Sequence, residues 1–302
     1  MATTTGTTRR NGVSAAAPAA QEPREKTKDS TRAFNVTAAV VLTVFAVLWL
    51  LPSLFALKTS LTTNSTAALG APAILSDLQI TFGSYLTLFQ AGDIWNWYLS
   101  SFITSAVTTV LTVLFASMGG YALSRLRFPG RNLVFLLMIL GIMVPAQVLV
   151  VPTFQMLDAA GLLNTYWAVI FPQVPAVIAL FVFKQFFDGL PRELEEAARI
   201  DGAGYWRIYR QVVMPLSGPV VAAMAIVTFV GVWNNLILPL FVLSNPELMT
   251  IPVGLATVQG SFGQMFADIQ ASAVLGALPL VVLYMIFQRR IIEGVAGTGI
   301  KG

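Results

Sequence analysis

Six long apolar stretches without a charged residue constrain this chain more than any other feature of its sequence. A hydrocarbon layer about 30 Å thick is crossed by about 20 apolar residues of helix. A segment in lipid must satisfy its own backbone polar groups, which favours helices. We therefore predict an all-α integral membrane protein with six transmembrane helices, at residues 36–57, 99–124, 133–154, 166–183, 219–243 and 269–287.

The composition supports this class. Of the residues, 56% are hydrophobic and 11% are charged, whereas soluble domains carry about 25% charged residues. None of the six stretches contains Lys, Arg, Asp or Glu, which argues against a proton-driven transporter. The sequence has no Cys and no His, so disulfides, Cys/His metal sites and His general bases are excluded. In the fourth stretch, Pro172 and Pro175 predict a kink.

Basic residues lie almost entirely on one side of this predicted topology. Of the 18 Lys and Arg residues, 17 fall before the first stretch, between the second and third, between the fourth and fifth, or after the sixth. Only Lys58 falls on the other side. Because short cytoplasmic loops collect Lys and Arg, we predict that both termini are cytoplasmic. The net charge of +4 is then a consequence of topology, and no nucleic-acid partner is expected.

The N-terminal residues 1–33 are rich in Ala, Thr, Pro and charge, which is typical of a disordered tail, here a cytoplasmic one. We expect residues 34–302 to form the transmembrane domain. The first apolar stretch is longer than the apolar part of a signal peptide, which has about 7–15 residues, and it ends in a poor cleavage site. We therefore expect an uncleaved first span.

The longest predicted cytoplasmic loop, residues 184–218, reads as two short helices separated by a turn. A proline suits the start of the first helix, and acidic residues favour the positive end of its dipole. Two glycines permit the turn, and apolar residues at helical spacing form one face of the second helix. A last proline is expected to end that helix. The residues concerned are Pro191, Glu193, Glu195, Glu196, Gly202, Gly204, Tyr205, Ile208, Tyr209, Val212, Val213 and Pro215.

This loop resembles the EAA loop of permeases from binding-protein-dependent ABC importers. The family pattern is Glu-Ala-Ala, three residues, Gly, nine residues, Ile, one residue and Leu-Pro. Here Glu196-Ala197-Ala198 is followed at the family's distances by Gly202 and Pro215, while Val212 and Met214 replace Ile and Leu. The extended segment 195–203, which includes Asp201, is similar to the carbohydrate branch, the maltose-type permeases.

Three further features agree with that branch, and the resemblance covers residues 35–302. They are Trp233-Asn234-Asn235, Pro279 followed by Gln288-Arg289, and the glycine-rich ending 294–302. In maltose-type permeases this ending reaches between the ATPase subunits. The residues alone are equally compatible with a frayed terminus.

The resemblance implies an ABC importer type I permease fold in a bacterial-type plasma (inner) membrane. The loop would dock as a coupling helix on a cytoplasmic ATPase, with Glu196 facing basic residues, Ala197 and Ala198 allowing close approach, and Gly202 setting the turn. The partners implied are two ABC ATPase subunits, a second permease subunit, an extracytoplasmic solute-binding protein and membrane lipid. The coupling-loop residues are Glu195, Glu196, Ala197, Ala198, Asp201, Gly202, Ile208 and Pro215.

The chain itself lacks the G-x-x-x-x-G-K-[ST] phosphate loop. We therefore expect no enzyme activity and no cofactor in this chain, with ATP and Mg²⁺ used by the partner ATPase. The pair Gly119-Gly120 is interpreted as a site of close helix packing rather than a phosphate cradle.

A few amides within the apolar stretches are candidates for a substrate path. Lipid-facing amides are costly, so they either line a polar path or join neighbouring helices. The candidates are Gln147, Gln173, Asn234 and Asn235, with Trp233 beside the last two.

The function predicted is import of a sugar or oligosaccharide by alternating access, driven by a separate ATPase. A polyol phosphate or another small polar solute is an alternative substrate. Two other classes are a secondary transporter or channel, which should show intramembrane charges or broken repeats, and a membrane scaffold that only anchors a cytoplasmic partner.

Overall fold

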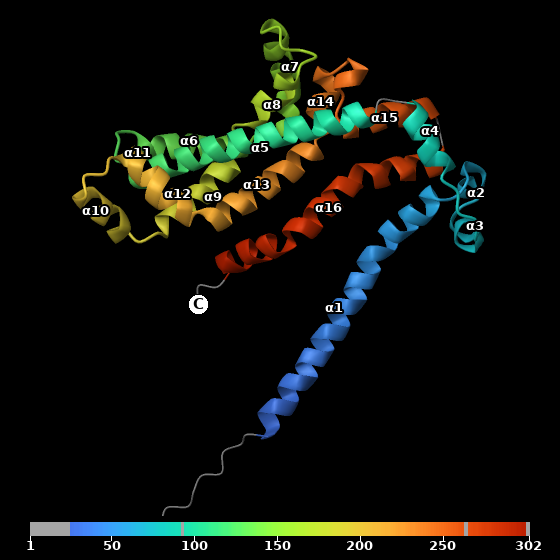
Figure 1. Ribbon diagram of the computed structural model, residues 1–302, viewed down its shortest axis with the longest axis horizontal. Coiled ribbons are helices and arrows are strands. Elements are labelled where there is room, and N and C mark those ends of the chain that lie inside the picture. Colours follow the sequence, from blue (N-terminus) through green and yellow to red (C-terminus); the bar gives the residue numbers. More distant parts are fainter. Residues whose placement is uncertain (1–24, 92–93, 263–264, 300–302) are drawn as a thin grey trace, which may run out of the picture. The chain divides into compact units, whose positions relative to one another are not determined.

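The computed structural model describes residues 25–91, 94–262 and 265–299, which form helices joined by turns, with no strand among them (Figure 1). Short helices lie between the long ones. The α-helices are α1 Glu25–Ser60, α2 Asn64–Ala68, α3 Ala71–Ser76, α4 Gly83–Ala91, α5 Ile94–Arg125, α6 Arg131–Ile142, α7 Val150–Ala159, α8 Tyr166–Ile170, α9 Val177–Asp188, α10 Glu193–Ile200, α11 Tyr205–Ile208, α12 Met214–Leu216, α13 Gly218–Trp233, α14 Ile237–Val242, α15 Ile251–Phe262 and α16 Phe266–Gly299.

Three helices are long and apolar enough to cross a membrane alone. They are Phe34–Ser60 within α1, the whole of α5, and Phe266–Gln288 within α16. Three bent pairs also qualify, so the described residues supply up to six spans. The pairs are Arg131–Ile142 with Ala146–Ala159, bent by 92°, Tyr166–Gln173 with Val177–Asp188, bent by 44°, and Tyr205–Leu216 with Gly218–Trp233, bent by 79°.

The bends show where the expected straight spans differ from the structure. The kink expected from Pro172 and Pro175 is present as the 44° bend. The predicted span 133–154 is instead two helices, because the chain turns sharply just before Pro145, which lacks the N–H that a continuing helix needs. The predicted span 219–243 is interrupted at residues 234–236, between α13 and α14.

Both ends of the described chain are more helical than expected. The helix α1 begins at Glu25, so residues 25–33 do not form the disordered tail predicted for 1–33. Residues 1–24 lie outside the described residues. The helix α16 continues to Gly299 through most of the glycine-rich ending, and only residues 300–302 lie outside.

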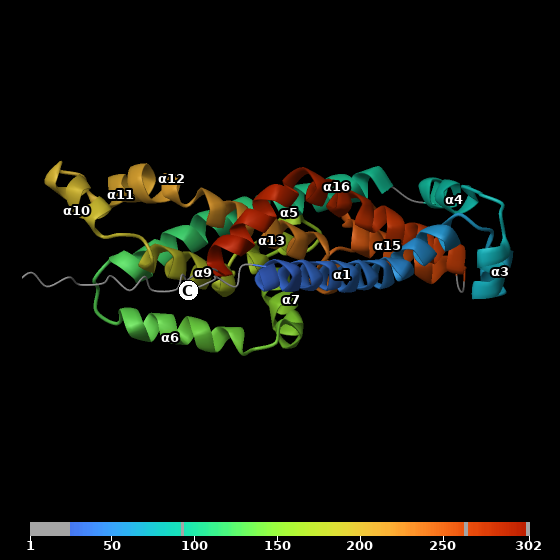
Figure 2. The same ribbon diagram turned by 90° about the horizontal axis from the view of Figure 1, so that it is seen from below.

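The chain divides into two units, residues 1–54 and 55–302. In the first, the side chains of α1 from Phe34 onward are largely exposed and apolar, as expected of a helix that is surrounded by lipid. The second unit is built around α5, which packs lengthwise against α9 and α13 (Figures 1 and 2).

Small residues allow α5 and α9 to approach closely. A Cβ atom added at Gly120 would lie 2.8 Å from Phe183 Cβ and 2.9 Å from the Lys184 backbone nitrogen. At Gly119 it would lie 2.8 Å from Leu180 Cδ1. The interpretation of this glycine pair as a packing site is confirmed, and the close contact fixes the end of α5 against the chain that leads into the 184–218 loop.

Candidate coupling site

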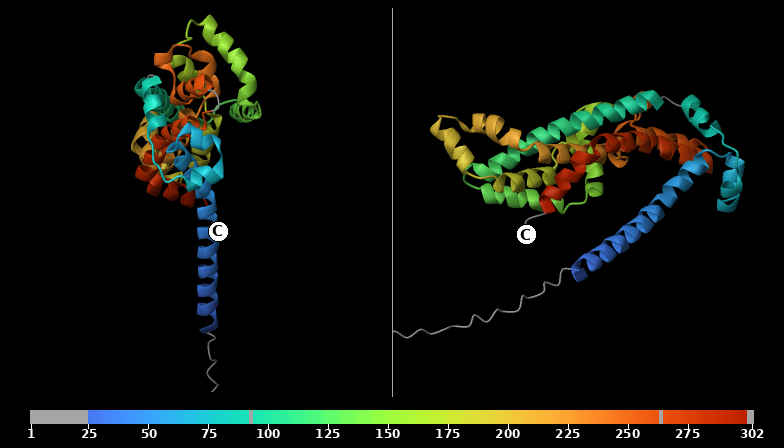
Figure 3. Two further views of the ribbon diagram at one scale, coloured as in Figure 1. Left: turned by 90° about the vertical axis from the view of Figure 1, so that its right-hand side faces the viewer. Right: turned by 60° about the horizontal axis from the view of Figure 1, so that its bottom comes forward.

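The 184–218 loop extends beyond one end of α5 as a short helical unit (Figure 3). Its first helix, α10, begins at Glu193, two residues after Pro191, and three glutamates occupy its first turn. These carboxylates stabilise the positive end of the helix dipole. The chain then reverses at Gly202, whose φ of +78° strongly favours glycine. The predicted pattern of helix, glycine turn and second helix is therefore present.

The second helix buries most of the face that its apolar spacing predicts. Ile208, Tyr209 and Val213 are buried in the core that joins α5, α9 and α13. Tyr209 Oη lies 2.9 Å from Ser117 Oγ of α5. Tyr205 departs from the pattern, since its side chain is half exposed. The hydrogen bond and the buried face attach this helix directly to α5.

Pro215 does not end the second helix, contrary to the expectation. The chain forms a turn of π-helix at Tyr209–Val213 and continues through Pro215 to Leu216. Proline lacks the N–H that a regular helix would donate to the preceding turn. The change of direction comes next, at Ser217, where α13 starts at an angle of 79° to the loop helix.

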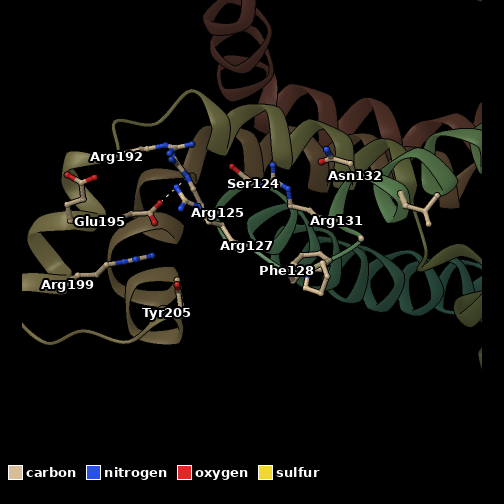
Figure 4. A pocket seen from close by; sticks show the side chains of 14 residues that line it. Ser124, Arg125, Arg127, Phe128, Arg131, Asn132, Arg192, Glu195, Arg199 and Tyr205 are labelled. Carbon is tan, nitrogen blue, oxygen red and sulfur yellow. Dashed lines mark ion pairs between the residues drawn. The ribbon is translucent and has the colours of Figure 1, made fainter.

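The two adjacent glutamates of the loop point in different directions. Glu195 is buried, and its Oε1 lies 3.0 Å from Arg125 Nε at the end of α5 (Figure 4). The side chain of Glu195 is 9% exposed and that of Arg125 is 5% exposed. Glu196 is exposed. Both glutamates belong to the predicted coupling loop, and of the two only Glu196, the one expected to face the ATPase, is exposed.

Arg125 joins three segments at this point, a role that sequence reasoning missed. Its Nη2 donates hydrogen bonds to the backbone carbonyls of Phe187, in the last turn of α9, and of Leu190, just after that helix. Its Nε faces Glu195 within ion-pair distance, although the N–H is not aligned for a hydrogen bond. The sequence offers one signal, because Arg125 directly follows an apolar span. The positive-inside rule already accounts for a basic residue at that position, so the charge gives no separate indication of a pairing role.

A second polar group fixes α9 to α5 beside this arginine. Ser124 Oγ donates to Asp188 Oδ1 at 2.6 Å, and Lys184 Nζ lies 2.6 Å from Asp188 Oδ2. The end of α9 is thereby held on the end of α5. Since α9 leads into α10, the polar contacts at both helices restrain the position of the whole loop.

The outward face of the loop is small and acidic. Glu196, Ala197, Asp201 and Gly202 are exposed, while Ala198 is half-buried against the core below. Small exposed side chains such as Ala197 and Gly202 allow close approach of another chain. The predicted docking role of these residues remains a prediction.

The structure brings together two of the four candidate path amides. Asn235 Nδ2 donates to Gln173 Oε1 at 2.8 Å, and Gln173 Nε2 donates to the Val169 carbonyl at 2.7 Å. Asn235 lies at the interruption between α13 and α14, and Gln173 lies at the 44° bend. Two interrupted segments thus meet through an amide pair.

The other path candidates lie elsewhere. Asn234 is exposed and donates to the Val230 carbonyl of its own helix at 3.0 Å. Gln147 is exposed in the 3₁₀ turn Ala146–Leu149. Trp233 is buried, and its indole N–H donates to the Gly276 carbonyl at 3.2 Å. Its position in the core with α5 and α16 favours packing over contact with solute.

Acidic side chains elsewhere form no metal site. Among the described residues, no three His, Cys, Asp or Glu side chains come together in a way that could hold a metal ion. Asp268, the buried acid at the start of α16, instead accepts a hydrogen bond from Asn64 Nδ2 at 3.1 Å. The Ala267 N–H donates to Asn64 Oδ1 at 3.0 Å. This pair joins α2 to α16.

Comparison with known proteins gives concordant results. Residues 113–294 match the family described as binding-protein-dependent transport system inner membrane component. The arabinooligosaccharides transport system permease protein AraQ of Halalkalibacterium halodurans is 40% identical, over 86% of this chain and 92% of that protein. The trehalose transport system permease protein SugB of Mycobacterium tuberculosis is 34% identical, over 84% and 93%. These relatives are permease subunits rather than ATPases.

A solved structure supports the fold. A chain of a bacterial ABC transporter involved in the import of the acidic polysaccharide alginate has a TM-score of 0.74 and 22% identity, over 86% of this chain and 97% of that one. The helical arrangement is therefore that of an ABC importer permease. The matched segment covers more than half of the chain and includes the C-terminal part of α5, the loop and most of α16. The chain therefore belongs to the family of inner-membrane components of binding-protein-dependent transport systems.

Proposed function

We propose that this chain is the pore-forming permease subunit of an ATP-driven importer for a sugar or oligosaccharide. It works by alternating access in a bacterial inner membrane. The partners are two copies of an ABC ATPase, a second permease subunit and an extracytoplasmic solute-binding protein. The chain crosses the membrane six times, with both termini and the 184–218 loop in the cytoplasm.

The observation that carries the proposal is the way the loop is held. Its inner side is fixed to α5 by Glu195 and Tyr209, and its outer side presents Glu196 and Ala197 without covering them. The outer surface of the loop is exposed and its inner side is bound to a membrane-spanning helix. Such a loop can transmit a displacement from a docked ATPase to the pore helices. ATP-driven closure of the ATPase dimer supplies that displacement.

The substrate class is supported by the relatives. Permeases for arabinooligosaccharides and trehalose are 40% and 34% identical to the chain over most of its length. The amide pair Asn235–Gln173, at two helix interruptions, supplies hydrogen-bonding groups of the kind that recognise hydroxyls. Interrupted helices in membranes are tolerated where they line a cavity. We therefore place the solute path beside this pair.

The test combines two substitutions on the exposed face of the loop, Glu196→Lys with Gly202→Asp. The first reverses the charge that faces the ATPase, and the second places a side chain at φ +78°. We expect the chain to remain in the membrane and ATP-dependent uptake of labelled oligosaccharide to fall to background. Uptake into cells and copurification of the ATPase are the two measurements.

A matched control is Arg207→Lys, which keeps the charge of an exposed residue on the same loop and is expected to support normal uptake. Normal uptake by the Glu196→Lys, Gly202→Asp variant would contradict the coupling role. Loss of uptake with the ATPase still bound would place the defect in transmission rather than in docking.

A further inference from the structure

A basic cleft opens beside the Arg125–Glu195 pair, between the end of α5, the start of α6 and α10 (Figure 4). Its volume is about 1040 Å³. Five arginines and two glutamates line it, so the cleft carries an excess of positive charge. The arginines are Arg125, Arg127, Arg131, Arg192 and Arg199.

Most of this positive charge is not neutralised within the chain. Arg125 is paired with Glu195. Arg199 stacks on the Tyr205 ring, with its guanidinium carbon 4.6 Å from the ring centroid. In the part of the chain that the structure describes, no carboxylate lies within ion-pair distance of Arg127 or Arg192, and both are exposed. Planar guanidinium groups bind phosphate in bidentate geometry. The cleft therefore suits a phosphate-bearing anion.

An apolar surface begins at the edge of the cleft. Phe128 and Leu133 belong to its lining, and α6 continues from Leu133 as a helix without a buried residue. Its large side chains are between 41% and 59% exposed at Leu133, Val134, Leu136, Leu137 and Leu140. Arg131 and Asn132 thus mark the boundary between a basic cleft and a surface suited to acyl chains.

We propose that this cleft binds the phosphate headgroup of an anionic phospholipid at the cytoplasmic membrane face, with the acyl chains along α6. The basic lining and the adjoining apolar helix match the two parts of one such molecule. A free phosphate would use only the arginines, and an acidic protein segment would have no use for the exposed leucines. Basic pockets between membrane helices on the cytoplasmic side are known to bind anionic headgroups.

The test is native mass spectrometry of the purified full chain with either phosphatidylglycerol or phosphatidylcholine of identical acyl composition. We expect selective retention of phosphatidylglycerol. The double substitution Arg127→Gln, Arg192→Gln removes two exposed guanidiniums that have no carboxylate within ion-pair distance, and we expect it to weaken that retention by about tenfold or more. Retention should also fall as salt is raised, because exposed charges are screened.

Two variants separate the proposal from a folding defect. Arg127→Lys with Arg192→Lys keeps both charges and loses only the bidentate geometry, so retention should stay within about threefold of the unsubstituted chain. Arg207→Gln removes an exposed arginine outside the cleft and should leave retention unchanged. Size-exclusion profiles and helix content identify any variant that has not folded.

Four results would overturn the proposal. Equal retention of the two lipids would show that charge does not select the ligand, and unchanged retention by the Gln pair would show that the lipid lies elsewhere. Displacement of phosphatidylglycerol by millimolar glycerol phosphate, which has no acyl chain, would assign the cleft to a soluble anion. If the Gln pair instead lost the copurifying ATPase with lipid retention unchanged, the cleft would be a protein-docking surface. None of these results depends on transport activity.

Discussion

Glu195 and Glu196 show how far neighbouring residues can differ in role. Both belong to the predicted coupling loop, and the family resemblance implies that Glu196 faces basic residues of the ATPase. The structure buries Glu195 beside Arg125 and leaves Glu196 exposed. Breaking a buried ion pair leaves one uncompensated charge in a poorly solvated place. The same substitution should therefore destabilise the protein at Glu195 and have little effect at Glu196.

We predict that Glu195→Gln destabilises the purified chain by about 3 kcal/mol, because Arg125 keeps its two carbonyl contacts but loses its counter-charge. Glu196→Gln should change the free energy of unfolding by less than about 0.5 kcal/mol, as surface substitutions usually do. Thermal unfolding in detergent measures both. In a double-mutant cycle, Glu195→Gln with Arg125→Gln should cost less than the sum of the single changes. Strict additivity would show that the pair contributes nothing.

The direction in which a loop side chain points could not be predicted from the loop alone. The residue pattern correctly predicted a helix, a glycine turn and a second helix within residues 184–218. The rotation of α10 about its axis depends on Arg125, which belongs to a different helix, and on the end of α9. Local propensity carries no information about such a distant partner.

At the scale of elements, the interruptions of the spans were the least predictable feature. Apolar content alone marked 133–154 and 219–243 as spans, yet the chain turns at residues 143–145 and 234–236. A hydropathy pattern measures how apolar a segment is and carries no information on its direction. Prolines gave the local signal. Pro172 and Pro175 predicted the kink in the fourth segment, whereas the turn before Pro145 in the third segment was not predicted. Of the breaks, the one at residues 234–236 brings Asn235 to Gln173.

The close contact of α5 and α9 leads to a prediction about glycine. Gly120→Ala would place a methyl group 2.8 Å from Phe183 Cβ and 2.9 Å from a backbone nitrogen, neither of which can move without shifting a helix. We predict a loss of about 1–3 kcal/mol in the free energy of unfolding. Gly119→Ala should cost less, because its nearest neighbour is the flexible end of Leu180.

The control for this prediction is Gly231→Ala in the last turn of α13, where a Cβ atom would meet nothing within 4 Å. Alanine is the better helix former, so this change should be neutral or slightly stabilising. Thermal unfolding in detergent separates the three variants. If Gly120→Ala were as stable as Gly231→Ala, the two helices would not be in the close contact described.

For the whole molecule, orientation in the membrane is predicted from the distribution of charge. The described helices supply between three and six spans, depending on whether each bent pair crosses once. Six spans place 17 of the 18 Lys and Arg residues on the same side of the membrane. An even number of spans therefore fits the positive-inside rule. The proposed coupling role requires the same arrangement, because the loop must face the ATPase.

The absence of cysteine makes this topology directly testable, since any thiol introduced is the only one in the chain. We predict that Glu247→Cys, in an exposed turn after α14, reacts with a membrane-impermeant maleimide in intact spheroplasts. Arg207→Cys, in the exposed part of the loop, should react only after the membrane is permeabilised. Labelling of both thiols in intact spheroplasts would place the loop outside and remove it from any ATPase. If neither thiol reacted before permeabilisation, both positions would lie on the cytoplasmic side. The chain between them, through α13 and α14, would then have to return to the side from which it started.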